Sequence, residues 1–182
     1  MYGNSIYPVL SRFYVTSKEA LKFTYERSIK YMIILGLPIS AGIYFLSDKI
    51  ILLLYGRQYL ESAAVLGILS GYLFLKFLNP ITGFTLIAID KQSSRLVGQG
   101  SAALINIVLN FILIPAYGFI GAAFATLVTE IIFFIIYLYF IREEGFALKF
   151  LPGFIYKPLT AIIIMGLLLY LIRPILANVI IL

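Results

Sequence analysis

Long apolar runs separated by short polar breaks dominate the chain, and the clearest pair of runs lies between Leu96 and Tyr139. The break between them reads PAYGFIGA and contains Pro115 and Gly118. Each run has about twenty residues, which at 1.5 Å per helical residue crosses a hydrocarbon core of roughly 30 Å. Because proline interrupts the hydrogen bonds of a helix and glycine permits a tight turn, this stretch predicts a transmembrane helical hairpin that ends its first run at Pro115.

Residues 1–59 predict one span with polar segments on either side of it. Residues 1–15 read as the end of a helix, and residues 16–30 are amphipathic, which is typical of a helix on the membrane surface. The first clear span is residues 31–47, where Pro38 permits a kink. Residues 48–59 are too short to cross again and predict a short interfacial helix.

Two further spans are predicted outside the hairpin. Residues 63–89 form the second, with Asn79 and Pro80 beyond its middle, and residues 158–172 form the last, which Arg173 and the following proline are expected to break. We therefore expect a single partial transmembrane domain made of four consecutive parts: a partial helix with a cytoplasmic amphipathic segment (1–30), four spans (31–141), a cytoplasmic connection (142–157), and a fifth span with a short tail (158–182).

Composition supports this fold class. The chain is 62% hydrophobic and 12% charged, against about 45–50% and about 25% in soluble domains. We predict an all-α membrane protein, a polytopic transmembrane helix bundle of about five spans. The sequence has no cysteine and no histidine, which excludes disulfides and the chemistry of Cys or His ligands and nucleophiles. We expect no metal site, no cofactor and no enzymatic activity.

Basic residues predict the orientation in the membrane. Most of the 14 lysines and arginines fall on alternate connections, among them residues 16–30, 90–95 and 142–157. Positive residues collect on the cytoplasmic side of cell membranes, so we expect a multi-pass plasma-membrane protein with its N-terminus in the cytoplasm and its C-terminus outside. The same distribution explains the net charge of +6 without a nucleic-acid partner.

Two charged residues lie in the middle of predicted spans. Lys76 is about halfway along the second span and Glu130 about halfway along the fourth, at matching depth. Each costs about 2.5–3.5 kcal/mol at the centre of a membrane helix, so such residues face a cavity or a partner. They could be structural, as an ion pair or as a lysine that snorkels to the membrane surface. Alternatively, Lys76 could contact an anion in a water-filled path, or Glu130 could carry a proton or sodium ion. We hypothesise that they pair.

Other polar residues and prolines in the spans read as structural. Asn106 and Asn110 lie one turn apart on one helix face, where amides commonly form hydrogen bonds between membrane helices. Asn79 belongs to the same class, and the prolines at positions 38, 80 and 115 mark kinks.

Ordered motifs over roughly Pro8 to Tyr139 resemble a known family. NIVLNFILIPAYGFIGAAFATLVTE resembles the N-x-x-x-N…(L/I)-I-P-x-x-G-x-x-G-A-A-x-A-T stretch of polysaccharide and oligosaccharide-lipid flippases. These belong to the multidrug/oligosaccharidyl-lipid/polysaccharide (MOP) exporter superfamily. LGLPISAGIYFLSDKIILLLYGRQY is similar to the family's proline-containing helix with its G-x-x-Y element, and ESAAVLGILSGYLF…LIAIDKQ to the next helix and its polar loop.

This resemblance implies a fold and a function. Family members enclose a cationic cavity between two lobes of helices and flip lipid-linked sugars across the bilayer, often coupled to an ion. The present spans correspond to helices nine to thirteen, part of the second lobe, so the resemblance implies a missing N-terminal lobe, in a separate chain or lost by truncation. It makes Lys76 the candidate for substrate contact and places Glu130 inside the lobe. The implied partners are the lipid bilayer, the lipid-linked sugar and the missing lobe.

Three alternatives stay open. The chain could be the equivalent part of a multidrug/cation antiporter of the same superfamily, where acidic rather than basic cavity residues are expected. It could also be a nonfunctional truncation or a structural membrane subunit. An enzyme such as a membrane glycosyl polymerase is the weakest reading, because the sequence offers neither large loops nor a catalytic cluster.

Overall fold

The fold is known from a computed structural model of the chain, which describes residues 2–146, 148 and 151–180. It is a bundle of helices whose elements follow one another as α1 (Tyr2–Thr16), α2 (Lys18–Tyr55), the short 3-10 helix η1 (Arg57–Tyr59), α3 (Ser62–Ala88), α4 (Gln92–Glu143), α5 (Leu151–Phe154) and α6 (Tyr156–Ile180). Three of them, α2, α3 and α4, are long and apolar enough to cross a membrane. The chain is a multi-pass membrane helix bundle.

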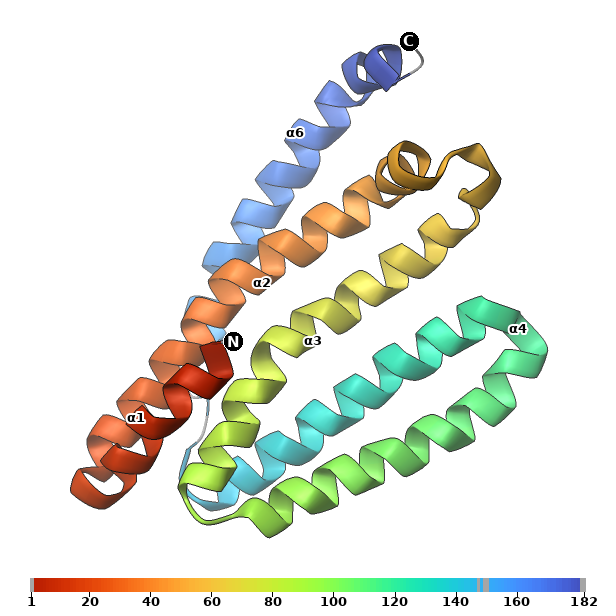
Figure 1. Cartoon of the computed structure of the whole chain (residues 1–182). Coiled ribbons are helices and arrows are strands. Elements are labelled where there is room, and N and C mark those ends of the chain that lie inside the picture. The colour runs from red at the N-terminus through yellow and green to blue at the C-terminus, as the bar shows by residue number, and fades with distance from the viewer. Residues whose placement is uncertain (1, 147, 149–150, 181–182) are drawn as a thin grey trace.

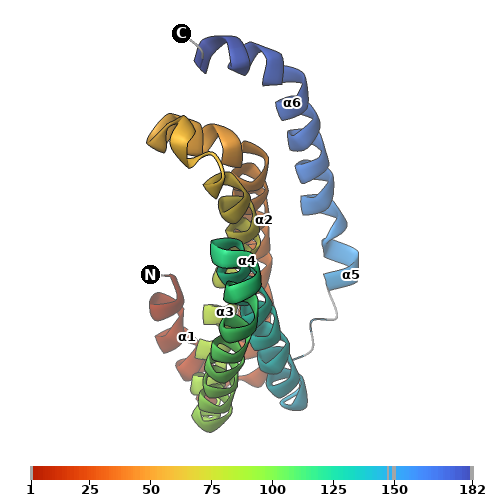
Figure 2. The ribbon, with the colours of Figure 1, turned by 90° about the vertical axis from the view of Figure 1, so that its right-hand side faces the viewer.

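The long helices run back and forth between two ends (Figure 1). At one end, called the Lys91 end, α1 meets α2, and the loop at Lys91 joins α3 to α4. At the opposite end, called the Tyr59 end, η1 joins α2 to α3, and α4 doubles back. Helix α3 packs between α2 and α4, while α6 lies along α2 on the outside of the bundle (Figure 2).

The apolar core lies towards the Lys91 end, between α1, α2, α3 and the second half of α4. Its largest fully buried side chains are two tyrosines and a set of aliphatic residues: Tyr25, Tyr137, Leu10, Leu21, Ile29, Ile33, Ile81, Leu86 and Ile141. Many large apolar side chains are exposed on the outside of the bundle, as expected where the surrounding medium is lipid.

Helix α2 differs from the prediction, because its 38 residues are continuous from Lys18 to Tyr55. The amphipathic segment expected at residues 16–30 leads into the first span without a break. Its apolar residues Leu21, Tyr25 and Ile29 are buried in the protein core, since their i, i+4 spacing places them on one face. The interfacial helix expected at residues 48–59 is wrong, because α2 continues to Tyr55. Pro38 lies inside the helix without ending it.

The predicted hairpin is present in α4, and its turn lies inside the predicted break PAYGFIGA, but the first run does not end at Pro115 as expected. The helix continues through Pro115, and the non-helical residue is Gly118, with φ 57° and ψ −136°. Proline fixes φ near the helical value and only removes one hydrogen bond, so it does not by itself reverse the chain. A positive φ of this kind is favourable for glycine alone, and Gly118 therefore sets the turn.

Helix α6 also exceeds its predicted length. It begins at Tyr156 and continues to Ile180, so the break expected at Arg173 and Pro174 does not occur. Proline inside a membrane helix is tolerated as a kink when the remaining hydrogen bonds of the helix persist. Close packing holds α6 to the bundle at Gly166, where an added Cβ would come within 3.1 Å of the Phe45 ring on α2.

An ion pair ties the loops together at the Lys91 end. Lys91 Nζ lies 2.8 Å from Glu144 Oε1, which links the α3–α4 loop to the end of α4. The hydrogen bond to this carboxylate and its charge raise the pKa of Lys91 above its usual value. Because both side chains reach solvent, the pair adds little to stability and keeps Lys91 charged.

Gly121 provides a test of the hairpin. A Cβ at this position would collide with the backbone carbonyl of Leu113 on the opposite run, which no rotamer change can relieve. We expect Gly121→Ala to lower the free energy of unfolding by about 1–3 kcal/mol, the usual cost of overpacking. Thermal unfolding of the purified protein in detergent measures the change.

The matched control is Gly100→Ala, because no atom lies within 4 Å of an added Cβ at Gly100 in the same helix. This variant should unfold at or above the wild-type temperature. Equal effects of the two substitutions would contradict the close approach at the turn.

Candidate functional site

The middle of the bundle contains an ion pair between α3 and the second half of α4. Lys76 Nζ lies 3.2 Å from Glu130 Oε2. The two ends of the pair differ in accessibility: the Lys76 side chain is 43% exposed and that of Glu130 only 8%. The carboxylate is therefore an internal group, while the ammonium reaches the surface of the described bundle.

Asn79 completes the coordination of the carboxylate. It lies one turn along α3 from Lys76, on the same face, and its Nδ2 donates a hydrogen bond of 2.6 Å to Glu130 Oε1. The two carboxylate oxygens thus have different partners, an ammonium and an amide. The Oδ1 atom of Asn79 is buried and has no hydrogen-bond partner.

Pro80 affects the backbone at the same place. Its ring nitrogen carries no hydrogen, so the helical hydrogen bond that would reach the carbonyl of Lys76, four residues earlier, cannot form. Helix α3 continues through this point to Ala88. The backbone next to the ion pair is consequently held less firmly than the rest of the helix.

A second polar network joins the two halves of α4. Asn106 Nδ2 donates to Thr129 Oγ1 at 3.2 Å, and Asn110 Nδ2 donates to both the backbone oxygen and Oδ1 of Asn106, at 2.8 and 2.9 Å. Thr129 itself donates to the carbonyl of Ala125. Thr129 and Glu130 are adjacent in the second half of α4. Thr129 bonds to the first half of α4 and Glu130 bonds to α3, so the two networks lie at the same depth in the bundle.

The chemistry available here is that of an anion site. An ammonium that is half exposed in the middle of a membrane bundle can bind a phosphate or carboxylate that approaches it from outside the pair. Tyr72, one turn before Lys76, places its ring centroid 5.0 Å from Nζ and adds a cation–π contact. Glu130, in contrast, is reached by its two protein partners and little else.

The predicted residues divide into three groups in the structure. The ion pair unites Lys76 and Glu130 with Asn79, whose part in the site the sequence did not reveal. Asn106 and Asn110 lie in the separate network between the halves of α4. The prolines at 38, 80 and 115 all lie inside helices.

The prediction missed two members of these networks. The spacing of Tyr72 four residues before Lys76 was a readable signal, because residues one turn apart share a helix face. Thr129 had no comparable signal, because its partner Asn106 lies on the other run of the hairpin.

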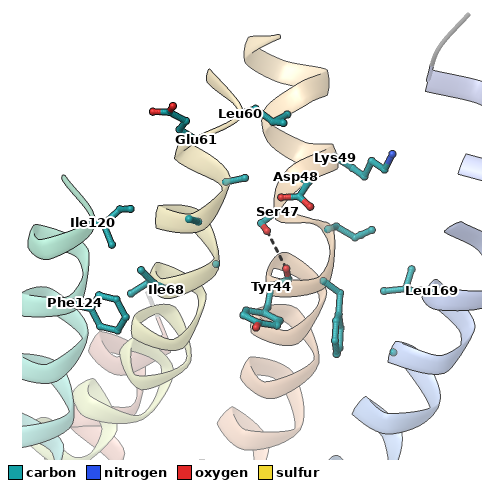
Figure 3. Close-up of a pocket in the computed structure, with 16 residues that line it drawn as sticks. Tyr44, Ser47, Asp48, Lys49, Leu60, Glu61, Ile68, Ile120, Phe124 and Leu169 are labelled. Atoms are coloured by element: carbon teal, nitrogen blue, oxygen red, sulfur yellow. Dashed lines mark hydrogen bonds between the residues drawn. The ribbon is translucent and has the colours of Figure 1, made fainter. Parts of the chain in front are cut away.

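A separate pocket of about 880 Å³ opens at the Tyr59 end between α2, α3, α6 and the tip of α4. Figure 3 shows Tyr44 and Phe124 on its walls, Leu169 facing it from α6, and Leu60 and Glu61 at its upper end. None of the predicted site residues lines it, so the ion pair and the pocket are two distinct features.

Comparison with known proteins places these features in context. Residues 4–64 match the family described as "Polysaccharide biosynthesis protein". The chain is 28% identical over 125 residues to a probable low-salt glycan biosynthesis flippase of Haloferax volcanii, covering 68% of this chain and 26% of that protein. It is 27% identical over 151 residues to a capsular polysaccharide biosynthesis protein of Staphylococcus aureus, covering 79% of this chain and 37% of that protein. The chain thus spans well under half the length of these relatives.

The fold has a counterpart among solved structures. The whole chain superposes on 44% of the lipid II flippase MurJ in an inward closed conformation, with a TM-score of 0.68 and 21% sequence identity. At that identity the likeness concerns the fold. It shows that the helices of this chain are arranged like part of a larger transport protein.

The ion pair predicts a specific response to mutation. Lys76→Met leaves the Glu130 carboxylate buried without a cation, and should lower the free energy of unfolding by about 2 kcal/mol, less than a fully buried pair because Lys76 is partly exposed. Adding Glu130→Gln should restore at least half of that loss, since a neutral amide needs no cation. Chemical unfolding in mixed micelles measures the full double-mutant cycle.

Lys22→Met is the matched control, because Lys22 is an exposed lysine near the Lys91 end. It should leave stability unchanged within about 0.5 kcal/mol. Strictly additive effects of the two substitutions at Lys76 and Glu130 would show that the pair contributes no coupling.

Proposed function

Since the chain belongs to the polysaccharide flippase family, we propose that it forms part of a flippase that moves lipid-linked oligosaccharide or polysaccharide precursors across the cell membrane. The names of its relatives and the arrangement of its helices support this proposal. The observation that carries it within the chain itself is the half-exposed ammonium of Lys76 in the middle of the bundle. Lipid-linked sugars carry anionic phosphates, which such an ammonium binds.

We further propose how the chain fits into the complete transporter. Its helices make five crossings: one each by α2, α3 and α6, and two by α4, which folds back at Gly118. These crossings constitute part of the second lobe of a two-lobed MOP transporter, helices nine to thirteen, with the first lobe supplied by further protein. The share of MurJ that the chain matches, 44%, is consistent with one portion of such an assembly.

In this proposal Lys76 is the substrate-contact residue and Glu130 controls it from inside the lobe. The ring of Tyr72 adds a cation–π contact to the same ammonium. The network of Asn106, Asn110 and Thr129 keeps the two runs of α4 in register, which fixes the depth of Glu130 opposite Lys76. The proposal assigns the chain no enzymatic step.

The alternative of a drug/cation antiporter is less well supported. Cation export requires a carboxylate that is free to bind the cation. Glu130 is the acidic residue in the middle of the spans, and it is occupied by Lys76 and Asn79. The remaining acidic residues lie towards the helix ends or in the loops: Glu19, Glu26, Asp48, Glu61, Asp90, Glu143 and Glu144.

Deletion of the gene in its source organism tests the transport proposal. We expect lipid-linked sugars to accumulate in the membrane and surface glycan to fall, because the precursors no longer reach the outer face. Wild-type protein should restore both, whereas Lys76→Met should restore less than a tenth of the surface glycan and Lys76→Arg an intermediate amount. A deletion that changes neither lipid-linked sugars nor surface glycan would refute the proposal, and would favour a structural subunit or an inactive truncation.

The proposed orientation predicts which loops are cytoplasmic. A single cysteine placed at Gln92 should be labelled by a membrane-impermeant thiol reagent only after the cells are opened. One placed at Gln58 should be labelled in intact cells. The native chain has no cysteine, so each label reports one position. The reverse pattern would overturn the placement of the N-terminus in the cytoplasm.

A further inference from the structure

The two side chains of the ion pair differ in their exposure, and this difference affects how an anion can bind. An incoming anion can reach the Lys76 ammonium, which is 43% exposed, but it cannot reach the cation from the side that Glu130 occupies. The anion and the carboxylate therefore compete for one positive charge. If the anion takes Lys76, Glu130 remains as a buried carboxylate without a cation and with a second negative charge nearby. Such a group is strongly disfavoured, and binding a proton removes its charge.

Asn79 is arranged to satisfy the carboxyl group in either state. At present its Nδ2 donates to the ionised Oε1 at 2.6 Å, and its Oδ1 has no partner although it is buried. A protonated carboxyl group carries an O–H that needs an acceptor. Rotation of the amide by half a turn would present Oδ1 to this O–H. The oxygen that now has no partner would then accept a hydrogen bond from the protonated carboxyl group.

We propose that Glu130 is a proton-dependent lock on Lys76, with Asn79 as its positioning residue, so that binding of an anionic phosphate group to Lys76 is coupled to the uptake of one proton by Glu130. The inference deepens the proposed function and rests on it, because it takes Lys76 as the anion contact. In the step itself an O–H bond of a hydronium ion in the solvent breaks, an O–H bond forms between its proton and a Glu130 oxygen, and a neutral water remains. The Lys76–Glu130 ion pair breaks, and Lys76 remains protonated and pairs with the anion.

The charge balance of the site follows from this step. The anion adds a negative charge to the middle of the membrane and the proton adds a positive one, so the net charge of the site does not change for a singly charged group. Release of the anion reverses both events, and Glu130 again takes Lys76 as its partner. The weakened backbone of α3 at Pro80 gives Lys76 room to move away from the carboxylate.

The other titratable groups around Glu130 are lysine, arginine and tyrosine side chains. Lys76 and Tyr72 face it from α3. On α4 the charge of Glu130 acts on Tyr137, and Arg95 lies beside Tyr137. Glu130 contributes the carboxyl group of this cluster, and the proposal assigns the proton to it.

The test uses the protein purified together with any chains that bind it. The probe has no group that titrates near neutral pH, so any proton taken up binds to the protein. A suitable probe is a diphosphate diester bearing a short isoprenyl chain and one sugar, such as citronellyl diphospho-N-acetylglucosamine. Calorimetry in two buffers of different ionisation enthalpy measures both the affinity and the protons taken up. Infrared difference spectroscopy follows the carbonyl stretch of the protonated carboxyl group.

We expect wild-type protein to take up about one proton per probe and to bind up to tenfold more weakly for each unit of rising pH above the midpoint. Glu130→Gln should bind tightly at every pH without proton uptake, and should lack the infrared band. Asn79→Leu should still bind, with the pH midpoint raised by about one unit, because the bond lost from the ionised carboxylate is charge-assisted and therefore stronger than the bond lost from the protonated carboxyl group. A residue with a merely structural part would not move this midpoint.

Two controls separate the inference from the function on which it rests. Glu143→Gln, at the exposed end of α4, should behave as wild type in every measurement. Lys76→Met should lose binding. If Lys76→Met binds as well as wild type, or wild type does not bind, the proposed substrate contact fails and the lock with it. If binding requires Lys76 but has the same pH dependence in wild type and Glu130→Gln, the coupling to protonation of Glu130 is refuted, while Lys76 remains the substrate contact.

Discussion

A carboxylate in the middle of a membrane bundle requires a cation next to it, and the placement of the other elements can be understood from that requirement. Glu130 is buried, so its charge must be compensated inside the protein. Lys76 does so from α3, and Asn79 adds a hydrogen bond from one turn further along the same face. This contact fixes the register of α3 against the second half of α4. Sliding either helix by one turn would separate the charges.

The hairpin in α4 brings the carboxylate to the required depth. Gly118 reverses the chain, Gly121 lets the two runs approach at the turn, and the bond between Asn106 and Thr129 aligns them lower down. The close packing of Tyr137 against Gly98, on the first run of α4, continues the same alignment towards the Lys91 end. The hairpin thus carries Glu130, while α3 opposite it lacks one helical hydrogen bond at Pro80.

The sequence predicted the features that depend on composition and depth. The helical hairpin, the membrane class and the family resemblance could be read from the apolar runs and from the order of the motifs, and the equal depths of Lys76 and Glu130 motivated the hypothesis of a pair. Helix ends were predicted less well, because a proline or a charged residue lowers the tendency to continue a helix without preventing it. Pro115 and Pro174 are both inside helices for that reason. The contact between Asn106 and Thr129 depends on how two distant runs face one another, which a helical period does not determine.

The most direct measurement of the central claim is the distance between Lys76 Nζ and the Glu130 carboxyl carbon in a lipid bilayer, by solid-state NMR on selectively labelled protein. At neutral pH without an anion, the account predicts a strong dipolar contact between the two labelled atoms and an ionised carboxylate. At low pH with the bound diphosphate diester, it predicts that the contact is lost and the carboxyl group is protonated. A contact that persists unchanged with the anion bound, or one that is absent under both conditions, would contradict the account.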